Sequence, residues 1–195
     1  TRNTVLTQTD GTVVAMTVAF GAVLGMLVEG HALDAAISAK LMARVKSGAL
    51  PFHTVTSGNL QAPRPGSVEV PTAGRFPSPD ALLTQSSIAR AALDPDVRIE
   101  PAWKVSLVYG MPCAVYHQFP AAYYLAARFA DDFESAVLHA VNGGGQNLAR
   151  AMLTGALVGA QVGFSRIPQR FITGLADSAA LRAIVQHVAA QVDTD

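Results

Sequence analysis

Three adjacent glycines followed by two amides form the stretch of this sequence best suited to hold a ligand. The chain reads NGGGQN from Asn142 to Asn147, and a long apolar segment with helical spacing follows it. Glycine lets the backbone approach a ligand closely, and the unpaired N–H groups at a helix start attract phosphates and other anions. The pattern therefore predicts an anion-binding loop at the beginning of a helix.

Other interpretations of this loop stay open at the level of sequence. The glycines can serve only to turn the chain tightly. Gln146 and Asn147 can be polar residues that start a helix by pairing its first N–H groups. The loop can also be a catalytic one that has lost its acids.

Few other residues are arranged for chemistry. Asp131 and Asp132 resemble a carboxylate pair, but they stand where a helix needs an N-cap, and capping is the favoured interpretation. Cys113 lies in an apolar setting with no base beside it, which predicts a buried, inert thiol. Tyr116 and His117 precede the glycine loop, where packing is favoured over a place in a cleft.

The histidines show no spacing typical of a metal site. They stand at positions 31, 53, 117, 139 and 187. His31 is expected only to close the end of a helix.

The elements that must position the loop are helical, and the predicted fold class is all-α. Almost no alternating strand pattern occurs, and the segment from 99 to 108 is too short to change the predicted fold class. The first predicted helix follows a cap at Thr9 or Asp10 and ends at Gly30, the second spans residues 33–46, and the third is capped by Ser78, starts at Pro79 and runs to Leu93. The next two are predicted to start at Pro120 and after Asp131 or Asp132. The last three are Asn147–Val162, a short helix from Pro168, and the final stretch SAALRAIVQHVAAQV.

Residues 49–79 form a proline-rich insert that cannot hold a long helix. A connection of this length is expected to be functional or mobile. Along the predicted helix Asn147–Val162 and the residue after it, by contrast, one face is formed by small residues at three- and four-residue spacing: Gly155, Ala156, Gly159, Ala160 and Gly163. This predicts close packing at the centre of the bundle, with the start of the helix buried.

Composition restricts the class of protein. The 195 residues are half hydrophobic, 14% are charged and the net charge is zero, so no nucleic-acid partner is expected. The lone cysteine excludes an internal disulfide and makes a reducing, cytoplasmic location the default. No leader is recognised at Thr1. The apolar run Gly11–Val28 contains three glycines and two threonines between acidic flanks, which favours a buried helix over a membrane span.

Four stretches together resemble a known family. They read LTQTDGTVVAMTVAFGAVLGMLVEG, YGMPCAVYHQFPAAYYLAARFADDFESAVLHAVN, NGGGQNLARAMLTGALVGAQVG and IPQRFITGL. In order and spacing they are similar to the ADP-ribosylglycohydrolase superfamily, in particular to a divergent branch that includes J-crystallin and selenoprotein J. In the family's loop pattern Asn142, Gly144 and Gly145 are kept, and Arg150 fits the divergent branch.

The resemblance implies an all-α hydrolase that cleaves ADP-ribose from its acceptor with divalent cations, usually Mg²⁺. It implies a ligand-binding set of Asn142, Gly144, Gly145, Gln146 and Asn147. The chain departs from the family where the metal should bind. Gln146 replaces the family's metal-binding Asp, and Leu148 replaces a second Asp of the catalytic branch. Because Mg²⁺ prefers anionic oxygen ligands, its ligands are not retained here, and no metal residue is predicted.

Two classes of function follow from the resemblance. One is hydrolysis of an ADP-ribosyl glycosidic bond by the intact protein, with catalytic residues unassigned. The other is a non-catalytic relative that binds a nucleotide-like ligand or serves structurally, as crystallins do. Residues 1–195 resemble the C-terminal part of one family domain, without its N-terminal portion. The expected partner is therefore an N-terminal fragment of the same protein or a second copy that covers the wide apolar helix faces.

Overall fold

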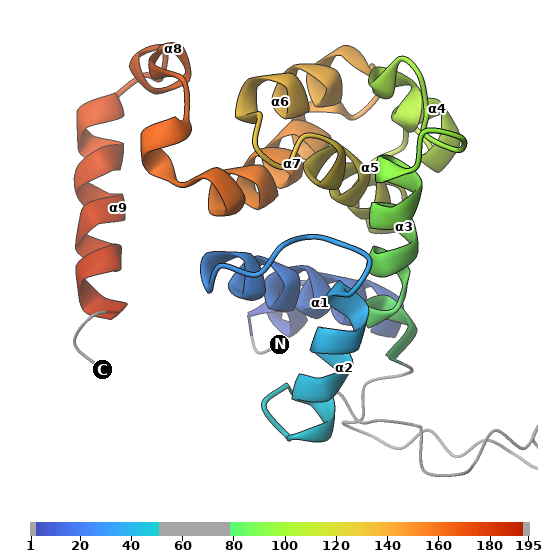
Figure 1. The fold of residues 1–195 in the computed structure, drawn as a ribbon. Helices are drawn as coiled ribbons and strands as arrows, with labels where there is room; N and C mark the ends of the chain where they lie inside the picture. Colours follow the sequence, from blue (N-terminus) through green and yellow to red (C-terminus); the bar gives the residue numbers. More distant parts are fainter. Residues whose placement is uncertain (1–2, 51–78, 193–195) are drawn as a thin grey trace, which may run out of the picture.

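The computed structural model describes residues 3–50 and 79–192, and these form an all-α bundle (Figure 1). This confirms the predicted fold class, since the described residues hold helices and no strand. Most of the proline-rich insert, with the predicted cap Ser78, lies outside them. The α-helices are α1 Gly11–Val28, α2 Ile37–Lys46, α3 Thr84–Leu93, α4 Val105–Tyr109, α5 Val115–Arg128, α6 Phe133–Asn142, α7 Asn147–Val162, α8 Gln169–Thr173 and α9 Ser178–Val192. Short 3₁₀ helices are η1 Thr4–Leu6, η2 Pro79–Leu82, η3 Ala102–Lys104 and η4 Phe164–Arg166.

Helix α5 is the centre of the bundle. It contacts α1, α3, α4, α6 and α7, and nine of its fourteen residues are buried. Its aromatic side chains extend the core toward α1, where the rings of Phe119 and Phe20 stack with centroids 5.0 Å apart. A helix that is surrounded in this way needs apolar or small residues on nearly every face, and the AAYYLAA run of α5 supplies them.

The helix ends follow local capping rules. The Asp10 carboxylate accepts the N–H of Val13 at 2.9 Å and caps α1. At the other end Gly30 has φ +87°, and the N–H of His31 bonds to the carbonyl of Met26, which closes α1 in a Schellman motif. His31 therefore closes a helix end as predicted, and it does so through its backbone.

Two predicted helix starts were wrong, and one predicted helix is interrupted. Helix α2 begins at Ile37, four residues late, because the Asp34 carboxylate accepts the N–H of Ala36 and holds a turn there. The third predicted helix divides into η2 and α3. Helix α5 begins at Val115, so Pro120 lies inside it. Burial of the residues around Pro120 outweighs the hydrogen bond that proline cannot donate.

Helix α1 is long and apolar enough to cross a membrane by length and composition. In the structure a third of its residues are buried, all on the side that faces the other helices. They are Val14, Ala15, Ala19, Val23, Met26 and Leu27. The burial of these residues is consistent with the predicted buried helix.

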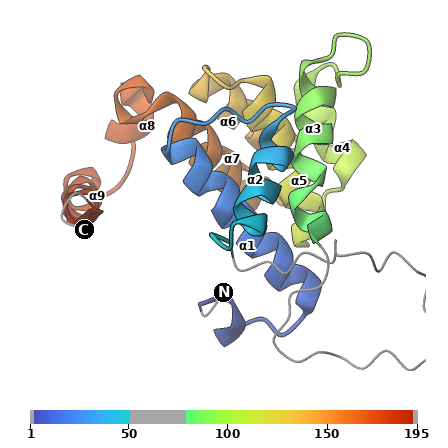
Figure 2. The ribbon, with the colours of Figure 1, turned by 60° about the horizontal axis from the view of Figure 1, so that its bottom comes forward.

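Helix α9 stands apart from the bundle in both views, joined to it through α8 (Figures 1 and 2). Every residue from 179 to 191 is exposed. The start of α9 follows Asp177, which has φ +56°, a conformation that Asp tolerates better than most residues. The final helix therefore forms where the sequence predicted it, but its apolar side chains are not covered by neighbouring helices.

Candidate functional site

The glycine loop reverses the chain between α6 and α7 in four residues. Gly144 and Gly145 have φ +69° and +59°, the left-handed region in which a side chain is strained. A Cβ atom added to Gly145 would lie 2.6 Å from Cβ of Met111, so the turn also needs the space that glycine leaves. The tight-turn interpretation therefore holds for the loop, and it is compatible with ligand binding.

Arg150 anchors the loop from beneath. Its side chain is completely buried, and its Nε donates to the carbonyl of Ala140 at 3.0 Å while Nη2 donates to the carbonyl of Gly144. Burial lowers the pKa of this guanidinium. The carbonyls at the end of α6 carry the negative end of its dipole, which compensates the buried cation.

Two further contacts fix the loop. The Ser106 hydroxyl donates to the carbonyl of Gly143 at 2.5 Å. On the other side, the carbonyl of Met111 accepts the N–H of Gln146 at 3.0 Å. The segment around Met111 is itself held by Gln118, which is buried and donates to the carbonyl of Pro112. The loop conformation is thus determined by α4, by the start of α5 and by Arg150.

The N-terminus of α7 is open. Gln146 is the N-cap, but its side chain makes no capping hydrogen bond. The N–H of Asn147 bonds to the carbonyl of Gly145 at 2.8 Å, and the N–H groups of Leu148 and Ala149 have no acceptor among residues 3–50 and 79–192. Gln146 therefore does not satisfy the first amides, contrary to the helix-start interpretation. These amides can bind an anion.

The start of α7 is also exposed, which corrects the predicted burial. Leu148 is 79% exposed, and Gln146 and Asn147 are exposed as well. The small-residue face of α7 explains the difference, since Gly155 and Gly159 pack against Phe133 near the middle of the helix and Ala156 faces outward. Close packing thus fixes the middle of α7 and leaves its first turn accessible.

A cavity of about 750 Å³ lies at the start of α5, and none of the residues that line it belongs to the glycine loop. Its polar wall comes from η1, the turn after it and Thr17 of α1, and its other wall from residues 113–116. Cys113 is exposed here, so the prediction of a buried thiol was wrong. Tyr116 lines this cavity and a second one of about 630 Å³, whereas His117 packs on Gly110 and donates through Nδ1 to the carbonyl of Tyr109.

Other charged candidates have structural roles. The Asp132 carboxylate caps α6, accepting the N–H of Ser135 at 3.0 Å and its hydroxyl at 2.6 Å. At Asp131 it is the backbone carbonyl that is used: it accepts a hydrogen bond from Nη2 of Arg166 at 2.8 Å. The ring of His139 stacks on Phe129 with centroids 5.0 Å apart. Capping was thus the correct interpretation of the acidic pair.

A sequence model of the ADP-ribosylglycohydrolase family matches residues 1–195, the whole chain. The chain belongs to the ADP-ribosylglycohydrolase family. No curated protein and no solved structure matches it. The family match does not separate branches, so the likeness to J-crystallin stays a prediction.

In this ADP-ribosylglycohydrolase-like protein the loop residues do not fit a Mg²⁺ site. The amide of Gln146 offers one neutral oxygen and Leu148 offers no ligand atom, whereas Mg²⁺ prefers carboxylates in octahedral geometry. Within the part of the chain that the structure describes, no group of three or more His, Cys, Asp or Glu side chains could hold a metal ion. His53 lies outside that part.

The sequence missed the anchoring role of Arg150. Its spacing from the loop gave a signal, because a side chain four residues after the N-cap lies one turn into α7, beneath the turn that precedes it. Its complete burial depended on α4 and α6, which no local pattern places.

Proposed function

We propose that this ADP-ribosylglycohydrolase-like protein binds an ADP-ribosyl ligand at the loop of residues 142–147. The unpaired N–H groups of Leu148 and Ala149 at an exposed helix start carry the proposal. They would donate to a phosphate oxygen, and the left-handed glycines would let the ligand approach the backbone. The family assignment supports ADP-ribose as the class of ligand.

Hydrolysis of an ADP-ribosyl glycosidic bond is the second candidate, favoured by the match to the family over the whole chain. It would require acids from outside the loop, because Gln146 and Leu148 cannot supply them. A cytoplasmic location is part of the same proposal, since the single cysteine is exposed and free. A purely structural role, with no ligand, is the alternative that the following experiment separates.

A proline substitution tests the binding amide directly. Leu148→Pro removes one N–H in the first turn of a helix, where proline is tolerated, and Leu148→Ala removes the same side chain and keeps the N–H. We expect ADP-ribose to raise the melting temperature of the wild type and of Leu148→Ala. Leu148→Pro should bind about tenfold more weakly, the usual effect of losing a hydrogen bond to a charged group.

Two results would count against this function. Equal binding by both variants would show that the ligand does not bind at the start of α7. If ADP-ribose does not raise the melting temperature of any form of the protein, the structural role is favoured. A calorimetric titration with Mg²⁺ completes the test: we expect no site tighter than millimolar, and a tight site that Gln146→Leu removes would restore the metal-dependent hydrolase.

A further inference from the structure

An apolar cavity lies between α9 and the end of the bundle, away from the glycine loop. Its volume is about 410 Å³, within the range of small-molecule sites. Three aromatic rings from α6, η4 and α8 form one wall, and aliphatic side chains of α9 form part of the other. The main apolar residues are Phe133, Phe164, Ile167, Phe171, Leu181 and Val185.

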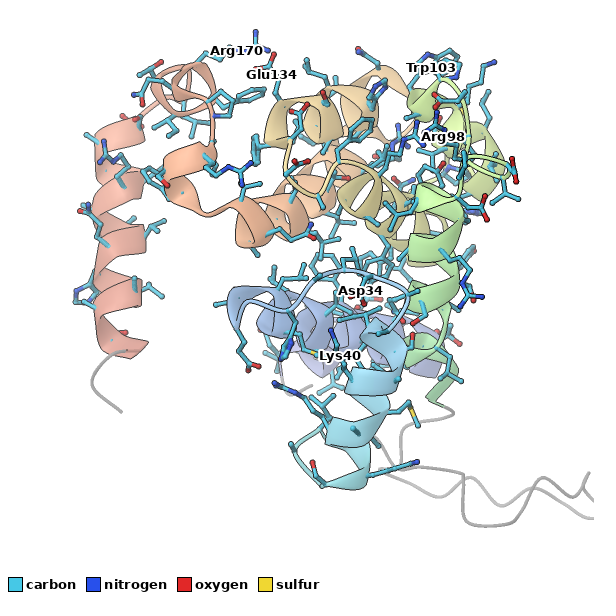
Figure 3. All side chains as sticks on the ribbon, in the orientation of Figure 1. Asp34, Lys40, Arg98, Trp103, Glu134 and Arg170 are labelled. Atoms are coloured by element: carbon cyan, nitrogen blue, oxygen red, sulfur yellow. The ribbon has the colours of Figure 1, made fainter. Side chains whose placement is uncertain are left out.

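Among the described residues, Arg182 is the one charged residue that lines this cavity, and no carboxylate does. The Arg182 guanidinium lies 5.5 Å from the ring centroid of Phe164, and it has no ion pair within residues 3–50 and 79–192. The nearby Arg170 differs, because it pairs with Glu134 across α8 and α6 (Figure 3). The cavity therefore presents a single uncompensated positive charge beside an apolar surface.

Side chains of residues 3–50 and 79–192 do not fill this space. Leu181 and Val185 line it and are still 46% and 61% exposed. Within the described part of the chain, the other polar side chains at the cavity are Ser178 and Gln186, which are neutral. A ligand that fills this cavity must therefore be largely apolar, and it should carry a negative charge only at the end that lies next to Arg182.

We propose that this cavity binds a single unbranched acyl chain whose carboxylate faces Arg182. The chain would cover Phe164, Phe171 and the inner face of α9, and it would remove their apolar surface from water. This site is separate from the glycine loop and does not depend on the proposed binding of ADP-ribose.

Calorimetric titration of the full chain with octanoate, decanoate and dodecanoate, each below its micelle-forming concentration, tests the site. We expect saturable one-to-one binding. Affinity should rise roughly fourfold with each added methylene until the cavity is full, and then stop rising. Dodecyltrimethylammonium, which has the same tail and a cationic head, should bind at least tenfold more weakly than dodecanoate.

Two variants and a control localise the binding. Arg182→Glu should weaken dodecanoate about tenfold, whereas Arg90→Glu, the same charge change on the distant helix α3, should not. Val185→Trp should abolish binding by filling the cavity, with a melting temperature no lower than that of the wild type.

Three results would overturn the proposal. The first is absence of saturable binding. The second is an equal effect of Arg182→Glu and Arg90→Glu. The third is a concentration-dependent dimer in light scattering that dodecanoate does not dissociate, which would show that a second copy covers this face.

Discussion

Helices α5 and α9 are nearly equal in length and similarly rich in apolar residues, yet their surroundings are opposite. Nine of the fourteen residues of α5 are buried, while residues 179–191 of α9 are all exposed. Both carry enough apolar side chains to pack against other helices, although α5 has them on nearly every face. The difference teaches that apolar composition makes burial possible, and that neighbouring helices from distant parts of the chain determine whether it occurs.

The sharpest test of this comparison uses one residue type in both helices. Leu125→Ala in α5 removes a fully buried side chain and should lower the free energy of unfolding by about 3 kcal/mol, because it leaves a cavity. Leu181→Ala in α9 removes a side chain that is 46% exposed and should cost less than about 1 kcal/mol. Urea unfolding followed by circular dichroism measures both. Equal losses would mean that α9 is packed in solution.

Arg150 tests how firmly the bundle holds the glycine loop. Arg150→Met keeps most of the volume but leaves the buried carbonyl of Ala140 and the partly buried carbonyl of Gly144 without their donor. We expect a loss of about 2 kcal/mol in the same unfolding measurement. The control Arg90→Met, at an exposed position on α3, should change stability by at most about 0.5 kcal/mol. A neutral Arg150→Met would show that the other helices hold the loop without this anchor.

A smaller, pH-dependent effect is expected at the first turn of α6. Hydrogen bonds from the Ser135 hydroxyl, and then from its N–H, hold the pKa of the Asp132 carboxyl below its usual value. A lowered pKa stabilises the fold above the unfolded-state pKa, and this contribution disappears as pH falls through the folded-state pKa.

Asp132→Ala should therefore cost about 1 kcal/mol at pH 7 and progressively less below about pH 4. Asp131→Ala, which removes the neighbouring carboxylate, provides the matched control. Thermal unfolding at pH 7 and at pH 3 distinguishes the two. A loss at Asp132 that persists unchanged at pH 3 would contradict the charged cap.

The smallest expected effect is a gain. A Cβ at Gly155 would lie 3.7 Å from Cγ2 of Val137 and 3.9 Å from Cζ of Phe133, an ordinary packing distance. Gly155→Ala should therefore stabilise α7 by about 0.5 kcal/mol, because alanine favours a helix. Gly145→Ala should be destabilising, since its φ is positive and Met111 lies too close. A rise in melting temperature for Gly145→Ala would contradict the loop geometry.

The sequence by itself determined where most helices form and how they end. Asp10, Gly30 and Asp132 act on neighbouring residues, so their capping roles can be recognised locally. The bounds of α7, Asn147–Val162, were predicted correctly for the same reason, because a glycine precedes the helix and another follows it. The family resemblance was carried by motifs in order, and the match over the whole chain bears it out.

Only the tertiary structure decided which surfaces are covered. Burial of Arg150, exposure of Cys113 and Leu148, and the proline inside α5 all depend on contacts between segments far apart in sequence. Capping and helical periodicity are properties of a few consecutive residues, whereas burial is a property of the whole packed chain. For that reason the sequence located the glycine loop, and the packing of α4, α5 and α6 around it left the start of α7 open.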